Sequence, residues 1–198
     1  MKTYTVYLIR HGRESRPGEV RYVGRTDLPL TDAGVAELRA LVAQEPYPPV
    51  QAVYTGPLLR CRQTAEILYP HLPATPVEGL TECDFGAFEN KTPQELKDDP
   101  AYAEWLSGGD PPGGESNERF FKRTVVAFAA LMEQVMAAGQ TEIALCLHGG
   151  SIMAILAQCG LPQRKPSDWF CQPGHGFVMR ITPGVWMRGY KAEVVAQF

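Results

Sequence analysis

Short apolar runs alternate with segments of helical periodicity along most of this chain. Parallel strands need long crossover connections, which are usually helices. The alternation therefore predicts an α/β fold, a three-layer α/β/α sandwich with a mostly parallel central sheet. Strands are predicted at residues 4–9, 52–55, 143–147, 177–181, 185–190 and 192–196.

Capping residues mark where several helices begin. Thr31 can cap a helix that starts at Asp32, and residues 92–95 (Thr-Pro-Gln-Glu) have the pattern of a capping box. Proline is tolerated at a first helical position, so Pro57 is expected to open a helix that continues to about Leu68.

Glycine and proline gather at residues 107–116, which are predicted to form a loop. Apolar residues at alternating spacings of four and three then mark one face of a long helix that ends near Gly139. These residues are Phe121, Val125, Phe128, Met132 and Val135. A further helix is predicted over 152–156.

The chain has 198 residues and a mass of 21.9 kDa, so residues 1–198 are expected to form a single domain. Its formal net charge of -3 offers no general attraction for nucleic acid. No apolar run reaches the roughly 18 residues that span a bilayer, so no membrane association is expected. The five cysteines include no C-x-x-C pair, which disfavours a disulfide framework and a thiolate zinc site and favours a cytoplasmic location.

Two predicted strands end in a histidine followed by glycine, as Arg10-His11-Gly12 and as His148-Gly149. The carboxyl ends of parallel strands share one edge of a sheet, where ligands of open α/β folds bind. Arg10 adds a permanent cation whose donors suit phosphate or carboxylate. Spacing alone does not bring the two histidines together, and a lone histidine is more often structural. The pattern makes this edge a candidate ligand site.

Five segments match one ordered set of family motifs. They are residues 8–12 (Leu-Ile-Arg-His-Gly), 24–31 with Gly34, 59–65 (Leu-Arg-Cys-Arg-Gln-Thr-Ala), Glu82 with Asp84-Phe85-Gly86, and His148-Gly149-Gly150. Together they resemble the motifs of the histidine phosphatase superfamily, also called phosphoglycerate mutase-like. Within it, residues 22–27, and Trp105 followed by 111–116, are most similar to the α-ribazole phosphatases, although related broad-specificity phosphatases share similar loops.

The resemblance implies a metal-independent phosphomonoesterase that needs no cofactor. His11 would attack phosphorus and carry the phosphoryl group as a phosphohistidine. Arg10 and Arg60 would hold the phosphoryl oxygens, and His148 would complete the pocket. Glu82 matches the proton donor of the family, and burial beside a phosphate dianion should raise the pKa of its carboxyl group.

Other substrate contacts are carried over with less support from residue chemistry. Gly24, Arg25 and Gly149 are expected to bind the substrate, although Arg25 fits a turn-stabilising role equally well. Asp84 or Glu115 could share the proton transfer of Glu82.

The chain departs from the common family pattern in three places. Glu14 and Pro17 stand where many relatives have threonine and asparagine, Thr55 replaces a common serine, and residues 88–90 read Phe-Glu-Asn instead of Trp-Glu-Gly. The other two histidines match no motif: His71 is expected in a loop, and the role of His175 is left open.

The leading functional prediction is hydrolysis of α-ribazole 5'-phosphate in cobalamin synthesis. A broad-specificity histidine phosphatase and a phosphoglycerate mutase are the alternatives, the mutase being disfavoured because the mutases it resembles are longer. The alternatives from other classes are a noncatalytic phospho-ligand binder and a metal hydrolase built on His11, His148, Glu82 and Asp84. The expected partner is a small phosphate ester, with no nucleic acid and no membrane, and a homodimer is the candidate assembly.

Overall fold

The computed structural model describes residues 2–15 and 19–198, and these residues form one seven-stranded sheet in the order β3-β2-β4-β1-β6-β7-β5. Adjacent strands from β3 to β1 are parallel, whereas β6 is antiparallel to both β1 and β7. The predicted α/β class with a mostly parallel sheet is confirmed. The strands are β1 Tyr4–Arg10, β2 Ala52–Thr55, β3 Ala74–Pro76, β4 Glu142–Leu147, β5 Gly160–Leu161, β6 Gly176–Ile181 and β7 Ala192–Gln197.

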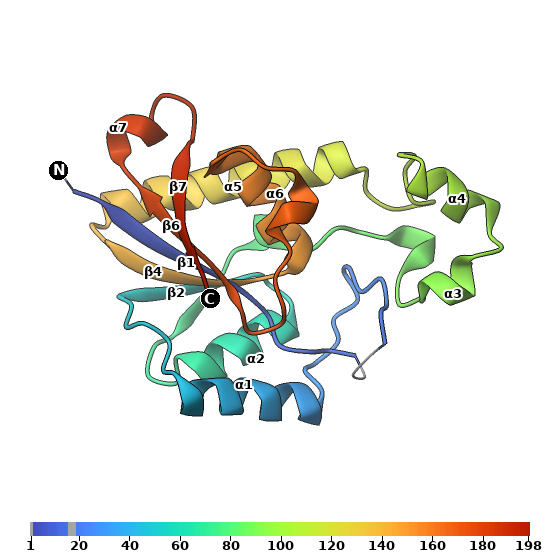
Figure 1. Ribbon diagram of the computed structural model, residues 1–198, viewed down its shortest axis with the longest axis horizontal. Coiled ribbons are helices and arrows are strands. Elements are labelled where there is room, and N and C mark those ends of the chain that lie inside the picture. The colour runs from blue at the N-terminus through green and yellow to red at the C-terminus, as the bar shows by residue number, and fades with distance from the viewer. Residues whose placement is uncertain (1, 16–18) are drawn as a thin grey trace.

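Helices cover both faces of the sheet, as Figure 1 shows. On one face lie α1 (Asp32–Gln44) and α2 (Leu59–Leu68), and on the other lie α5 (Asn117–Ala137) and α6 (Gly149–Cys159). The shorter helices are α3 Pro93–Leu96, α4 Pro100–Leu106, α7 Pro183–Trp186 and three 3-10 helices, Glu78–Leu80, Gly86–Phe88 and Pro166–Trp169. In the part of the chain described, no helix is long and apolar enough to cross a membrane.

The central strand β4 is buried on both faces, which explains its continuous apolar run. Ile143 and Leu145 pack in the core on the α5 and α6 side, while Ala144 and Cys146 pack toward α1 and α2. Burial of each large aliphatic side chain stabilises the fold by about 1.5–3 kcal/mol. Because β1 is the parallel neighbour of β4 and ends in register with it, the residues that follow both strands meet at one edge.

The predicted starts of α1 and α3 are confirmed, and two other helix starts are corrected. The helix predicted over 152–156 is α6, which begins at Gly149. Thr31 caps α1 by accepting a hydrogen bond from Gly34 N, and the capping box at 92–95 forms at the start of α3. Helix α2, however, begins at Leu59 and not at Pro57. The backbone amide of Leu59 donates a hydrogen bond to Oδ1 of Asp27, in a distant loop, at 2.6 Å. Local sequence could not reveal that partner.

The segment predicted as a strand at 185–190 is instead helix α7 followed by a turn. Pro183 occupies the first turn of α7, where its fixed φ suits a helix, and Tyr190 has a positive φ of 55° that ends any regular structure. Trp186 is fully buried and packs edge-on against Phe128, 5.8 Å between ring centroids. The apolar residues of this segment therefore anchor a helical turn and do not extend the sheet.

Helices α3 and α4 belong to a small lobe beside the end of the sheet, visible at the right of Figure 1. Its core is a cluster of aromatic rings with centroids 4.9–5.9 Å apart. The rings belong to Tyr22, Phe85, Phe88, Tyr102 and Trp105. Because Tyr22 comes from the loop after β1, this cluster fastens that loop to the lobe.

Candidate active site

The two strand-end histidines lie together at the edge predicted from the sequence. His11 follows β1 and His148 follows β4, and their ring centroids are 5.2 Å apart with an edge-on interplanar angle of 69°. His11 is 4% exposed and His148 is fully buried. Parallel pairing of the two strands, in which Arg10 is the register partner of Leu147, produces this proximity.

The hydrogen bonds of His11 fix its tautomer. Its Nδ1 lies 2.7 Å from the carbonyl oxygen of Gly12, which can only accept, so Nδ1 carries the proton. Its Nε2 accepts from Nε of Arg60 at 3.2 Å and therefore holds the lone pair. Burial, with Arg60 and Arg10 nearby, lowers the pKa of His11 well below its ordinary value, so the ring is neutral near pH 7. A neutral imidazole with its lone pair on Nε2 can act as a nucleophile.

Arg60 is a fully buried cation in the first turn of α2. Besides reaching His11, its guanidinium donates to the carbonyl oxygens of Gly24 at 2.6 Å and Thr26 at 2.8 Å. Gly24 therefore contributes its carbonyl group to the placement of Arg60. A buried guanidinium with these fixed donors is the type of group that binds phosphoryl oxygens.

Glu89 binds the backbone of residues 24–26, the loop whose carbonyl groups accept hydrogen bonds from Arg60. Its carboxylate accepts from the backbone amides of Gly24, Arg25 and Thr26 at 2.9–3.2 Å. It also accepts from Thr26 Oγ1 at 2.6 Å and from Phe85 N at 3.0 Å. Burial acts to raise the pKa of Glu89, but these hydrogen bonds outweigh it and lower that pKa, which keeps the carboxylate ionised.

Arg10 lies beside the start of α6. Its Nη1 donates to Cys171 O at 2.8 Å, whereas its buried Nε has no hydrogen-bond partner among the described residues. A Cβ added at Gly149 would lie 3.3 Å from that Nε, so glycine there lets the guanidinium approach the helix. A cation next to a helix N-terminus favours anions, because the helix dipole adds its own positive end.

Glu82 is 7% exposed and lies at the same helix start. Its two carboxyl oxygens accept from the backbone amides of Cys83 at 2.8 Å and Gly150 at 2.9 Å. A Cβ at Gly150 would come within 2.4 Å of Glu82 Oε1, so the second glycine of the histidine motif makes room for this carboxyl group. Burial raises the pKa of Glu82, against the opposing effect of those amides and of Arg60 and Arg10.

The other two carboxylates considered for proton transfer are held differently. Glu115 forms a bidentate pair with Arg123 at 2.6 and 2.7 Å. Burial acts to raise the pKa of Glu115, but Arg123 and Arg25 outweigh it, so this carboxyl group has a lowered pKa. Asp84 accepts from Gly86 N at 2.9 Å. Among these three carboxyl groups, Glu82 has the environment that suits an acid.

Arg123, on α5, is a structural contact that the sequence motifs did not indicate. Besides binding Glu115, it donates to the backbone carbonyls of Gly79, Thr81 and Glu82 at 2.9–3.1 Å. It therefore fixes the backbone that carries Glu82.

His148 packs against Cys61, whose sulfur lies 3.4 Å from its Nε2. Burial, then Arg60 and His11, lower the pKa of His148 well below its ordinary value. The hydroxyl of Thr55, which ends β2, is buried without a hydrogen-bond partner in the described part of the chain.

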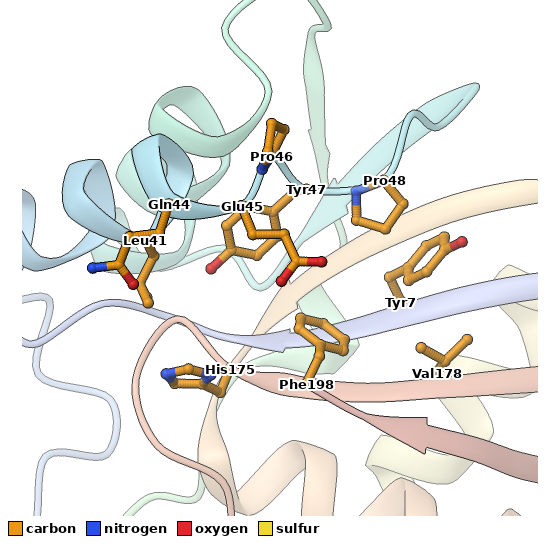
Figure 2. A pocket seen from close by; sticks show the side chains of 10 residues that line it. All are labelled: Tyr7, Leu41, Gln44, Glu45, Pro46, Tyr47, Pro48, His175, Val178 and Phe198. Atoms are coloured by element: carbon orange, nitrogen blue, oxygen red, sulfur yellow. The ribbon is translucent and has the colours of Figure 1, made fainter.

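The remaining residues that the sequence singled out have different surroundings. The carbonyl oxygen of His175 accepts from Arg10 N at 2.9 Å, but its side chain lines a cavity of about 600 Å³ whose lining includes none of the catalytic candidates; Figure 2 shows it near Phe198. His71 is exposed in a turn, and Pro17 lies outside the described residues. Arg25 is half exposed, and its guanidinium lies near Asp84 and Glu115. Within residues 2–15 and 19–198, no three His, Cys, Asp or Glu side chains are grouped as metal ligands would be.

Comparisons with known proteins match one family over most of the chain. The family model of the histidine phosphatase superfamily (branch 1) matches residues 6–188. The 2,3-bisphosphoglycerate-dependent phosphoglycerate mutase 2 of Gloeobacter violaceus is 29% identical over 161 residues, which are 76% of this chain and 73% of that protein.

Solved structures share the fold over almost the whole chain. The α-ribazole phosphatase from Shigella flexneri has a TM-score of 0.81 at 22% identity, with 98% of this chain and 95% of that chain covered. A phosphoglycerate mutase from Thermus thermophilus has a TM-score of 0.69 at 29% identity, with 98% of each chain covered.

Proposed function

Because the chain belongs to the histidine phosphatase superfamily, we propose that it is a phosphomonoesterase in which His11 carries the phosphoryl group between two transfer steps. The observation that carries the proposal is the tautomer of His11, whose Nε2 lone pair is held beside Arg60 and His148. An unprotonated ring nitrogen among fixed cationic donors suits in-line attack on phosphorus.

In the first step, Nε2 of His11 forms a bond to phosphorus while the bond from phosphorus to the ester oxygen breaks. The electron pair of that bond stays on the leaving oxygen, which takes a proton from Glu82. Arg10 and Arg60 bind the phosphoryl oxygens, over which charge spreads in the transition state. His148 lies beside the same ring and completes the pocket.

In the second step, water attacks phosphorus and gives a proton to Glu82, and the bond from Nε2 to phosphorus breaks. The electron pair returns to the imidazole, so enzyme and proton donor are restored. The chemistry needs no metal, and a chelator is expected to leave turnover unchanged; loss of activity in EDTA that zinc restores would contradict this scheme.

We propose α-ribazole 5'-phosphate as the substrate, on the resemblance of residues 22–27 and 111–116 to that branch. The alternatives remain a less selective phosphatase and a mutase. The expectation that mutases are longer does not separate them, because this chain covers 98% of a phosphoglycerate mutase from Thermus thermophilus. Activation of phosphoglycerate isomerisation by 2,3-bisphosphoglycerate would favour the mutase. The cytoplasmic location stays a prediction.

The proposal is tested with His11→Ala, using p-nitrophenyl phosphate as the substrate. The variant should lose at least about a thousandfold in kcat, because the nucleophile is gone. His71→Ala is the matched control, since His71 is exposed in a turn and matches no motif. Thermal unfolding shows whether each variant folds. A folded His11→Ala protein with near-normal turnover would refute the proposal.

A further inference from the structure

A cavity of about 470 Å³ is lined by residues from the segments that flank Gly24, Arg60 and Glu82. Its walls are Arg25, Pro57, Leu58, Glu78, Thr81 and Arg123. Most of these residues adjoin the site in the chain: Thr81 precedes Glu82, and Arg25 follows Gly24. Pro57 and Leu58 lead into the helix that carries Arg60. The cavity therefore lies beside the segments that carry Arg60 and Glu82.

The two cations of the cavity are already paired with carboxylates. Arg123 has its bidentate partner in Glu115, with side chains 25% and 10% exposed. The Arg25 guanidinium lies 3.5 Å from Glu115 and 3.7 Å from Asp84. Of the three carboxylates, Glu78 is the one that lines the cavity itself. The two wall guanidiniums, the two carboxylates paired with them and Glu78 together carry a formal charge of -1.

We propose that this cavity selects phosphate monoesters whose leaving group is uncharged and carries hydroxyl groups; the inference rests on the proposed phosphatase function. A leaving group with a carboxylate or a second phosphate would face net negative charge, and it would have to displace Asp84 or Glu115 to reach a cation. Hydroxyl groups can instead donate to the carboxylate oxygens and exchange hydrogen bonds with Thr81. The charge of the cavity thereby selects among phosphate esters.

Glycerol 3-phosphate and 3-phosphoglycerate form a matched pair of probes, because they differ mainly in a CH₂OH group against a carboxylate. Steady-state kcat/KM is measured for both, with p-nitrophenyl phosphate as the reporter of phosphatase activity. Glycerol 3-phosphate is expected to be favoured by about tenfold. A preference within about twofold of equality, or one for 3-phosphoglycerate, overturns the inference.

Asp84→Asn removes one carboxylate charge beside Arg25 while keeping similar size. It should lower the preference for glycerol 3-phosphate several-fold, because Arg25 gains freedom to pair with the substrate carboxylate. Glu78→Gln removes a carboxylate charge from the cavity lining, and it serves as the second variant if Asp84→Asn folds poorly. Glu133→Gln is the control, an equal change of charge at an exposed position of α5 that does not line the cavity.

The outcomes separate the two proposals. Absence of p-nitrophenyl phosphate hydrolysis by the folded wild-type protein refutes the phosphatase function itself. The protein could instead hydrolyse p-nitrophenyl phosphate and prefer glycerol 3-phosphate, with Asp84→Asn and Glu78→Gln changing that preference no more than Glu133→Gln does. This result refutes the assignment of the preference to the cavity. If Asp84→Asn or Glu78→Gln lowers the preference for glycerol 3-phosphate and Glu133→Gln does not, the result supports both the phosphatase function and the role of the cavity.

Discussion

Glu82 is a buried carboxyl group whose two oxygens each accept one backbone amide. Burial raises its pKa, which keeps a larger share of the carboxyl groups protonated than at an exposed site. A protonated carboxyl next to the bound ester can supply the proton that a poor leaving group needs. At the scale of single residues, the role of Glu82 is therefore the sharpest chemical expectation.

Glu82→Gln is expected to slow hydrolysis of alkyl phosphates by about 10²–10⁴-fold and of p-nitrophenyl phosphate much less. An aryl leaving group departs without protonation, whereas an alkoxide does not. The measurement is kcat/KM for both substrates, with Glu133→Gln as the control. Equal slowing of the two substrates would exclude Glu82 as the acid.

The pH dependence of activity provides a second test of the role of Glu82. For alkyl phosphates, wild-type activity should fall as pH rises through the raised pKa of Glu82, because the acid loses its proton. The Glu82→Gln variant should lack this alkaline limb. If the activity of the variant falls at alkaline pH in the same way, the fall belongs to the titration of another group.

At the scale of elements, the loop of residues 24–26 connects the lobe to the catalytic candidates. Glu89 binds three consecutive amides of the loop, and the loop carbonyls bind Arg60. Because Arg60 in turn reaches His11, Glu89 is a positioning residue that acts through Arg60. An amide side chain could not accept all of these hydrogen bonds, since half of it is a donor.

Glu89→Gln should lower kcat/KM for p-nitrophenyl phosphate by about ten- to a hundredfold, the equivalent of about 1–3 kcal/mol for unsatisfied buried amides. The diagnostic measurement is a double-mutant cycle with Arg60→Ala. If Glu89 acts through Arg60, its substitution should cost almost nothing in the Arg60→Ala background. Full additivity of the two losses would mean that Glu89 supports the fold generally.

The sequence predicted the elements whose signals are local. The Thr31 cap and the capping box at 92–95 needed only neighbouring residues, and both formed. Helix α4 was missed although Asp99-Pro100 repeats the cap-then-proline signal, with Asp99 accepting from Ala101 N. The start of α2 depended on Asp27, a contact 32 residues away that no local pattern contains.

The candidate site divides in the same way. The meeting of His11 and His148 followed from two strand ends and parallel pairing. Glu89 and Arg123 act through backbone amides and carbonyls of distant segments. The spacing of residue types gave no sign of Arg123, whereas Glu89 is the residue that segment 88–90 shares with the Trp-Glu-Gly of the family. His175 has a motif-like glycine on each side, yet it lines a different cavity.

At the scale of the whole molecule, the site places two neutral histidines in the interior, and stability should depend on pH in consequence. Burial lowers the pKa of both His11 and His148, so the unfolded chain binds more protons than the folded protein below the ordinary histidine value of about 6.5. Their contribution to stability is present above that value and is lost as pH falls. Glu82, with its raised pKa, acts in the opposite direction but is a single group.

The free energy of unfolding, measured in urea, is therefore expected to fall between pH 7 and pH 5. His148→Gln should show a shallower fall than the wild type, while the exposed-site variant His71→Gln should match the wild type. The same slope for all three proteins would show that the buried histidines do not titrate on unfolding. That residues 1–198 form one domain stays a prediction, which a single cooperative transition in these experiments would support.

The whole arrangement, in which two strand ends, a helix start and a fastened loop surround one ring nitrogen, is tested most directly by trapping the covalent intermediate. Turnover of p-nitrophenyl phosphate is quenched in alkali within milliseconds, and the digested enzyme is analysed by mass spectrometry. One phosphoryl group is expected on the peptide that contains His11, at that histidine, and it should disappear as substrate is exhausted. A phosphoryl group on any other side chain, or full turnover with none on His11, would contradict the account.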